Sequence, residues 1–107
     1  MPSTKRPSSR KRAALPRRAD HTKQFEKDWD RLTASGRYDM TRLREVMLLI
    51  IANTGPLPAE WQDHELKGDW ADHRECHVGG DFLLIYTVSA SKVVFTRTGT
   101  HAELFKS

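Results

Sequence analysis

The segment from Trp70 to Thr98 constrains the fold more than any other part of the chain, because it contains three strand-like runs joined by turn sequences. Phe82–Val88 is a nearly continuous apolar run, as a central strand should be. Gly79-Gly80 before it and Ser89-Ala90-Ser91 after it are typical of turns. We therefore predict a three-stranded antiparallel meander with strands over 70–78, 82–88 and 92–98.

Two helices are expected before this meander. Phe25, Trp29 and Leu32 recur at helical spacing and predict a helix over 21–35, with Asp20 as its N-cap and Gly36 at its end. A wider apolar stripe predicts the main core helix over 39–53; its members are Met40, Leu43, Val46, Met47, Ile50 and Ile51.

The remaining segments complete the expected architecture. Residues 13–18 could form a short edge strand, residues 57–68 lack periodicity and predict a loop, and a short turn or helix should follow from His101. The predicted fold class is α+β, with two N-terminal helices on one face of a small, mainly antiparallel sheet.

Length and composition limit the class of protein. A chain of 107 residues is expected to form one small domain. No apolar run is long enough to cross a bilayer, so we expect that the chain is not an integral membrane protein. The single cysteine, Cys76, excludes an internal disulfide framework and a cysteine-based zinc site, is compatible with a reducing cytoplasm, and is expected to pack within the sheet.

The positive charge is concentrated at the N-terminus. The formal net charge is +4, of which residues 1–20 contribute +6 and the rest of the chain −2. Residues 1–12 are rich in Pro, Ser and basic residues and are expected to form a disordered arm before a single domain at 13–107. Such an arm could simply aid solubility, or it could attract phosphate backbones.

Four histidines, an aspartate and an arginine gather in the last third of the chain: His64, His73, His77, His101, Asp81 and Arg97. His73 and His77 would lie about 13 Å apart along a strand, so their spacing does not favour a metal site. Phosphodiester cleavage through a 2′-hydroxyl needs a base, a cation and an acid, which these residue types supply without a metal or cofactor. Alternatively, they are surface residues and Arg97 forms a salt bridge.

A series of motifs in register resembles the RelE/ParE superfamily of bacterial toxins, nearest the YafQ type. The motifs are Leu57-Pro58, Asp63-His64-Glu65-Leu66-Lys67-Gly68-Asp69-Trp70, Arg74-Glu75-Cys76-His77-Val78, Asp81-Phe82-Leu83-Leu84-Ile85-Tyr86, Arg97-Thr98-Gly99-Thr100-His101 and Glu103-Leu104-Phe105. The resemblance covers about residues 13–107. It implies the RelE-like microbial RNase fold and a toxin that enters the ribosomal A site and cuts messenger RNA.

The resemblance also implies site residues and partners. His64, His77, Asp81 and His101 match acid–base positions, with His101 the expected general acid, and Arg97 matches the arginine that stabilises the transition state. Phe105 matches a substrate-positioning aromatic, and Phe82 stands where a tryptophan is usual. Phe82 is therefore expected to keep an aromatic face for stacking on the substrate, without the indole donor. The implied partners are the ribosome, messenger RNA and a cognate antitoxin, through which the complex would bind operator DNA; no metal, cofactor or membrane is implied.

Two other functions stay open from the sequence. A ParE-like gyrase inhibitor would keep the fold without catalysis, although relatives of that kind lack this histidine set. An RNA-binding module would act through the basic arm, and deletion of residues 1–12 would then remove its activity.

Overall fold

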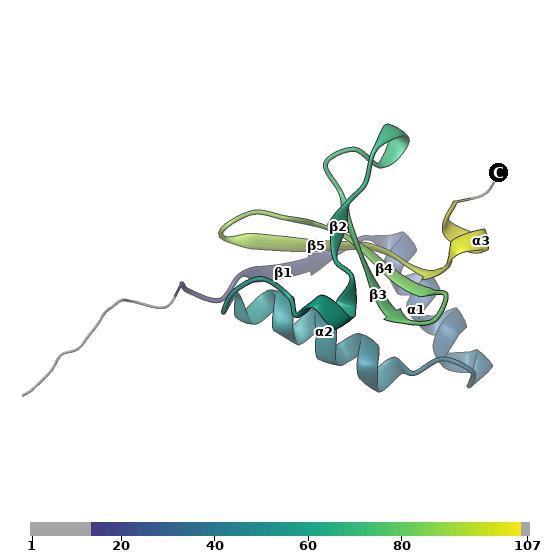
Figure 1. Cartoon of the computed structure of the whole chain (residues 1–107). Coiled ribbons are helices and arrows are strands. Elements are labelled where there is room, and N and C mark those ends of the chain that lie inside the picture. Colours follow the sequence, from purple (N-terminus) through teal and green to yellow (C-terminus); the bar gives the residue numbers. More distant parts are fainter. Residues whose placement is uncertain (1–13, 106–107) are drawn as a thin grey trace, which may run out of the picture.

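The computed structural model describes residues 14–105 and has two layers, a five-stranded sheet and two helices that cover one of its faces (Figure 1). The strands are β1 (Arg18–His21), β2 (His64–Glu65), β3 (Arg74–Gly79), β4 (Phe82–Val88) and β5 (Lys92–Thr100), and the helices are α1 (Lys23–Ser35), α2 (Met40–Ala52) and α3 (His101–Leu104). The predicted α+β architecture is confirmed, while the arm predicted for residues 1–12 lies outside the described residues.

The strand order is β1-β5-β4-β3-β2, and all pairs are antiparallel except β1 with β5. The predicted meander is confirmed as β3, β4 and β5, but β3 begins at Arg74 and not at Trp70. Gly68 and Asp72 adopt left-handed backbone conformations, with φ of 67° and 73°, which reverse the chain before the strand begins. Residues 66–73 therefore form a hairpin that projects from the sheet, closed by a 2.9 Å hydrogen bond from the Leu66 amide to the His73 carbonyl (Figure 1).

The start of α1 differs from the prediction. Asp20 is not the N-cap, because it belongs to β1 and pairs with Val94 of β5. The helix starts only after the strand has ended, and the hydroxyl of Thr22 accepts a hydrogen bond from the Phe25 amide at 3.0 Å. The predicted N-terminal strand exists, but it spans Arg18–His21 and not residues 13–18.

The prediction for α2 is confirmed within one residue at each end, with Asp39 as N-cap and Asn53 as a left-handed C-cap. The predicted loop at 57–68 contains more structure than expected, since it includes the 3-10 turn Ala59–Trp61 and strand β2. Trp61 is buried, and the guanidinium carbon of Arg42 lies 4.0 Å from the centroid of its ring. One isolated tryptophan has no periodicity, so its burial was not visible in the sequence.

Apolar side chains are buried on both faces of β4, which explains its continuous apolar sequence. Leu84 and Tyr86 join the main core under α1 and α2, whereas Leu83, Ile85 and Leu104 form a smaller cluster on the opposite face. The smaller cluster is covered in part by Leu66, Trp70 and Phe105. Each fully buried side chain of this size contributes about 1.5–3 kcal/mol, so this cluster holds α3 and the 66–73 hairpin near the sheet. No helix within residues 14–105 is long and apolar enough to cross a membrane.

Candidate active site

Strand register places two of the predicted site residues, His64 and Arg97, in one row across the sheet, on the face opposite α1 and α2. His64 of β2 pairs with Glu75 of β3, Glu75 with Ile85 of β4, and Ile85 with Arg97 of β5. Directly paired residues point to the same face, so these side chains share one surface. Adjacent strands lie about 4.8 Å apart, which puts Glu75 and Arg97 about 10 Å from one another. His77, paired with Leu83, belongs to the next row.

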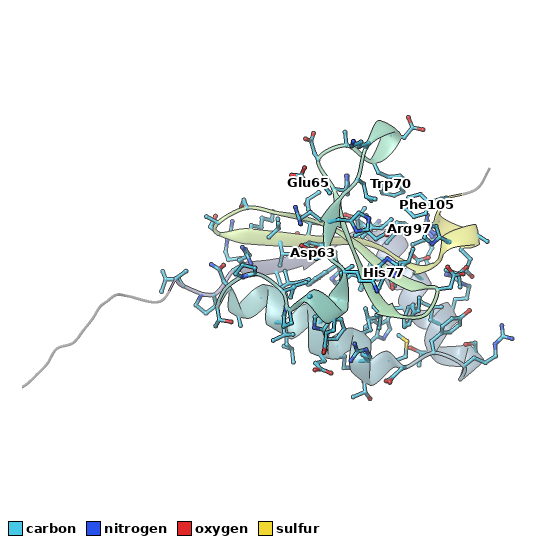
Figure 2. All side chains as sticks on the ribbon, in the orientation of Figure 1. Asp63, Glu65, Trp70, His77, Arg97 and Phe105 are labelled. Atoms are coloured by element: carbon cyan, nitrogen blue, oxygen red, sulfur yellow. The ribbon has the colours of Figure 1, made fainter. Side chains whose placement is uncertain are left out.

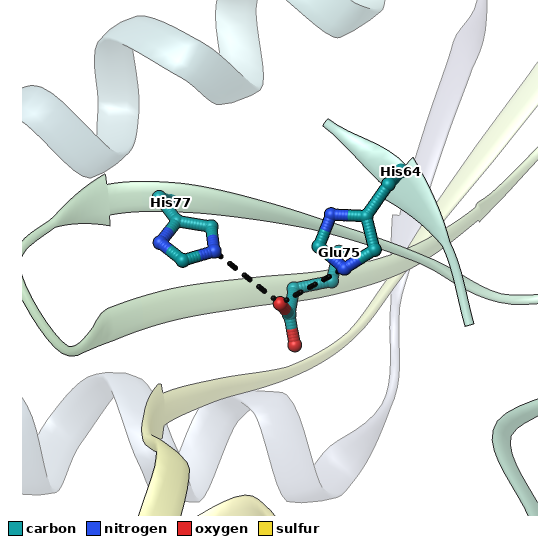
Figure 3. A group of neighbouring side chains, drawn as sticks. All are labelled: His64, Glu75 and His77. Atoms are coloured by element: carbon teal, nitrogen blue, oxygen red, sulfur yellow. Dashed lines mark ion pairs between the residues drawn. The ribbon is translucent and has the colours of Figure 1, made fainter. Parts of the chain in front are cut away.

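The carboxylate of Glu75 lies between two histidines (Figure 3). Its Oε2 is 3.3 Å from His64 Nε2 and 3.5 Å from His77 Nε2, and Glu75 is only 3% exposed. The Nδ1 of His64 is 2.9 Å from the Gln62 carbonyl oxygen, and a carbonyl can only accept. His64 therefore carries a proton on Nδ1, and its Nε2 is the atom that faces Glu75.

The residue before His64 anchors the segment that carries this histidine. Asp63 accepts two hydrogen bonds from Arg74, from Nε at 3.0 Å and from NH2 at 2.6 Å, and a further one from the Tyr86 hydroxyl. The hydrogen bonds from Arg74 to Asp63 raise the pKa of Arg74. Burial raises the pKa of Tyr86, and the hydrogen bond from the Tyr86 hydroxyl to Asp63 raises it further. These ionic and hydroxyl contacts fix β2 against β3 and β4.

The side chains of His64, Glu75 and His77 form the kind of donor set that binds a metal. One ligand atom from each of His64, Glu75 and His77 lies within 4.8 Å of the others. Two imidazole nitrogens and a carboxylate oxygen suit zinc or copper. The sequence raises His73 and His77 as a possible metal-binding pair, but His73 does not belong to this donor set. It precedes β3, and its Nδ1 lies 3.2 Å from the Ala71 carbonyl oxygen.

Asp81 and His101 meet at the edge of this surface. Phe82 pairs with Thr100, so the residues just before β4 and just after β5 lie side by side. The amide of His101 donates to Asp81 Oδ1 at 3.2 Å, and its Nδ1 is 3.3 Å from the same oxygen. Thr100 and Glu103 form a capping box that starts α3 at His101. The side chains of Asp81 and His101 are both exposed, as groups that meet a polymer substrate must be.

Arg97 is held by a carboxylate from α1. Its Nε and NH2 donate to the two oxygens of Asp28, at 2.8 and 3.1 Å. Burial raises the pKa of Asp28, but hydrogen bonds from Arg97, Arg31 and the Thr98 amide outweigh burial, so the pKa lies below its usual value. Asp28 is therefore ionised at neutral pH, and it pairs with Arg97, whose side chain is 23% exposed.

One of the two predicted substrate-contacting aromatics lies at the site. The ring centroids of Phe105 and His101 are 5.2 Å apart, and Trp70 meets Phe105 edge to face at 6.2 Å (Figure 2). Phe82 is only 5% exposed and packs on Tyr38 in the main core. The expectation that Phe82 offers a stacking surface is therefore not supported, because its ring points to the helix-covered face.

Two residues of the site were missed in the sequence. Glu75 stands two positions before His77 in β3, and residues two apart on a strand point to the same face, so this spacing was a usable signal. Asp28 had no comparable signal, because it lies 69 positions from Arg97 on a different element. Cys76 packs in the core as predicted, and burial raises the pKa of its thiol, so it carries no site chemistry.

Comparison with known proteins gives one consistent family. Residues 17–106 match the family described as "Bacterial toxin of type II toxin-antitoxin system, YafQ". The chain is 42% identical over 91 residues to the mRNA interferase toxin YafQ of Escherichia coli K12, which covers 85% of this chain and 98% of the relative.

Solved structures agree with this family. The E. coli DinJ-YafQ complex matches with a TM-score of 0.75 and 43% identity, covering 83% of this chain and 98% of that chain. A metal-bound toxin from Helicobacter pylori matches with a TM-score of 0.70 and 33% identity, covering 82% and 98%. The family match, the fold and the predicted motifs agree, and this chain belongs to the YafQ family of bacterial type II toxins.

Proposed function

We propose that this chain is an mRNA interferase, a ribosome-dependent endoribonuclease that inhibits translation by cutting messenger RNA through its 2′-hydroxyl. The E. coli relative bears the name mRNA interferase toxin, which supports the reaction class. The observation that carries the proposal is that one sheet face and its edge gather acid–base groups and a cation. Its members are His64, Glu75, His77, Asp81, Arg97 and His101.

The proposed reaction transfers two protons and needs no metal or cofactor. A base removes the proton of the 2′-hydroxyl, and the 2′-oxygen attacks the adjacent phosphorus. The bond from phosphorus to the 5′-oxygen then breaks, and an acid protonates the departing oxygen. The products carry a 2′,3′-cyclic phosphate and a 5′-hydroxyl.

The geometry supports distinct roles for the side chains. His101 is the proposed acid, because Asp81 lies at its Nδ1 and its Nε2 makes no hydrogen bond within residues 14–105. His64, His77 and Asp81 arrange the 2′-hydroxyl and remove its proton. Arg97 stabilises the negative charge of the transition state, and such a donor contributes about 10²–10³-fold to the rate.

The proposed partners follow from the same family. The solved DinJ-YafQ toxin–antitoxin complex supports a cognate antitoxin for this chain, and we propose that the resulting complex binds operator DNA through the antitoxin. The free toxin would act in the cytoplasm on messenger RNA in the ribosomal A site. Phe105, with Trp70 at its edge, would position a base of the substrate.

The test is a translation reaction with purified ribosomes and a defined messenger, analysed by primer extension. Wild-type protein should cut at fixed positions in frame only when ribosomes are present, and His101→Ala should lose these cuts while remaining folded and binding its antitoxin. Cuts without ribosomes would overturn the ribosome dependence. Intact messenger together with accumulated DNA breaks would favour gyrase inhibition instead.

A further inference from the structure

Asp28 is a fully buried carboxylate that the reaction scheme does not use. It lies on α1 with 0% of its surface exposed. An ionised group at such a place is costly unless its partners satisfy it completely. Its contacts therefore indicate what the fold requires of this position.

Both oxygens of Asp28 are saturated with donors. Oδ2 accepts from Arg97 Nε at 2.8 Å and from the Thr98 amide at 3.1 Å. Oδ1 accepts from Arg97 NH2 at 3.1 Å and from Arg31 NH1 at 2.9 Å. Gln24 Nε2 lies further away, at 3.5 Å. Four close donors occupy the roughly four lone-pair positions of a carboxylate, so the side chain has one strongly preferred orientation.

The position of Thr98 at the edge of the sheet explains why a side chain, and not a neighbouring strand, accepts the hydrogen bond of its amide. β1 ends at His21 opposite Phe95, and β5 continues to Thr100 without that strand neighbour. The register of β5 against β4 also shifts by one residue between Phe95 and Arg97. Helix α1 supplies what a strand would otherwise provide: the Thr22 hydroxyl donates to the Thr96 carbonyl at 2.7 Å, and Asp28 accepts from the Thr98 amide.

The pairing of Asp28 with Arg97 is side-on, since it uses Nε and one terminal nitrogen. A guanidinium has five N–H donors, and this geometry leaves three of them, two on NH1 and one on NH2. Within residues 14–105 these three make no other hydrogen bond. Arg97 also borders a cleft of about 390 Å³ together with Gln24, Arg31 and Glu103, so its outer edge can meet a ligand.

We propose that Asp28 is a positioning residue that holds the guanidinium of Arg97 for the phosphate of the substrate, an inference that rests on the proposed function. A free arginine side chain loses much rotamer freedom when it binds, and Asp28 removes that cost before the substrate arrives. Misplacement of a catalytic group by about 1 Å can lower a rate by about 10²-fold.

The first test measures single-turnover cleavage on programmed ribosomes. Asp28→Asn preserves shape but turns an acceptor oxygen into a donor that faces other donors. We expect the rate at saturation to fall about 10- to 100-fold, with little change in the half-saturating concentration. Asp30→Asn makes the same chemical change at an exposed position of α1 that contacts neither Asp28 nor Arg97, and its rate should stay within about threefold of wild type.

A double-mutant cycle separates positioning from a general structural role. If Asp28 acts through Arg97, the Asp28→Asn, Arg97→Ala double variant should cut at the same rate as Arg97→Ala alone, within about threefold. Multiplicative losses would overturn the proposal. If wild-type protein does not cut messenger at all, the proposed function fails instead, and the two failures are therefore distinguishable.

A measurement on the free wild-type protein does not depend on activity or on whether Asp28→Asn folds. In ¹H–¹⁵N spectra the Arg97 Nε–H, identified by its absence in Arg97→Lys, should give a sharp signal that exchanges with water at least tenfold more slowly than arginine Nε–H groups without a buried acceptor. An Arg97 Nε–H that exchanges as fast as these groups would overturn the proposal.

Discussion

At the scale of single residues, the candidate site depends on carboxylates that align its other groups. Glu75 places His64 and His77 within 3.5 Å of one oxygen, and Asp81 makes a similar contact with His101. Asp28 does the same for Arg97. Each histidine or arginine of the proposed mechanism thus has a carboxylate partner, and the protein fixes their orientation before substrate binds.

Glu75→Gln should lower the cleavage rate about 10- to 100-fold, because the neutral amide removes the negative charge that lies 3.3 Å from His64 Nε2 and 3.5 Å from His77 Nε2. The measurement is single-turnover cleavage together with the histidine ring signals in NMR spectra. Glu65→Gln is the matched control, since Glu65 lies on neighbouring β2 and its side chain is 83% exposed. Equal rates for both variants would show that Glu75 has no part in the reaction.

Metal ions should inhibit the proposed reaction and not support it. A histidine nitrogen bound to zinc cannot accept a proton, and His64, Glu75 and His77 are close enough to share one ion. Protein that is treated with a chelator and then separated from it before ribosomes are added should cleave at the same rate as untreated protein, whereas added Zn²⁺ should inhibit cleavage. His64→Ala should weaken zinc binding measured by calorimetry. Loss of cleavage in the chelator-treated protein, with recovery on adding zinc to it, would refute metal-independent catalysis.

At the scale of secondary-structure elements, the part of the site that contains Arg97 and His101 lies where α1, β5 and α3 meet. Helix α1 replaces the missing strand along β5, and α3 begins directly at the end of β5. Gly99, the penultimate residue of β5, has φ of 155°, a conformation that residues with a side chain rarely adopt. A Cβ there would lie 2.6 Å from Glu103 Oε1, the atom that closes the α3 capping box.

Gly99→Ala should therefore destabilise the protein by about 1–3 kcal/mol, from the strained backbone and the displaced Glu103. It should also lower cleavage, because α3 carries His101. Thermal unfolding and single-turnover cleavage are the measurements. Gly79→Ala provides the comparison, since an added Cβ at Gly79 meets no atom within 4 Å. If both glycine variants unfold at the same temperature, the close approach at Gly99 is unimportant.

The link between α1 and β5 should depend on pH. The pKa of Asp28 in the folded protein lies below its usual 3.8, so the stability that its ionised form contributes is complete above that value and disappears as pH falls through the folded pKa. Near pH 7, Asp28→Asn should cost about 3 kcal/mol, the lower end for a broken buried pair because Arg97 and Arg31 reach solvent. Urea unfolding at several pH values should show this difference shrinking below about pH 4; a constant difference would contradict it.

At the scale of the whole molecule, positive charge and proposed chemistry occupy different parts of the chain. The described fold buries one sheet face under α1 and α2 and carries the candidate site on the other. Residues 1–12 contain five basic residues and no acidic one, and their removal changes the formal net charge from +4 to −1. We propose that these residues assist association with the ribosome and take no part in the chemistry.

Deletion of residues 1–12 should keep the single-turnover rate at saturation but weaken ribosome association and reduce its dependence on salt, because fewer counterions are released. Binding and cleavage measured between 50 and 200 mM salt test this. A full-length variant with the five basic residues changed to Gln controls for length alone and should behave like the deletion. Complete loss of cleavage at saturation would favour an RNA-binding module that acts through the arm.

The sequence by itself determined the helices and the meander, since these depend on local periodicity and turn residues, and its short motifs indicated the type of chemistry through a family resemblance. Asp20 and Trp70 show its limits: each was assigned to the wrong element, because pairing with β5 and the reversal at Asp72 overrode the local pattern. Only the tertiary structure decided that Glu75 lies between His64 and His77, that Phe82 is buried, and that Asp28 holds Arg97. Such contacts depend on strand register and on helix packing across 69 positions of sequence, which no local pattern encodes.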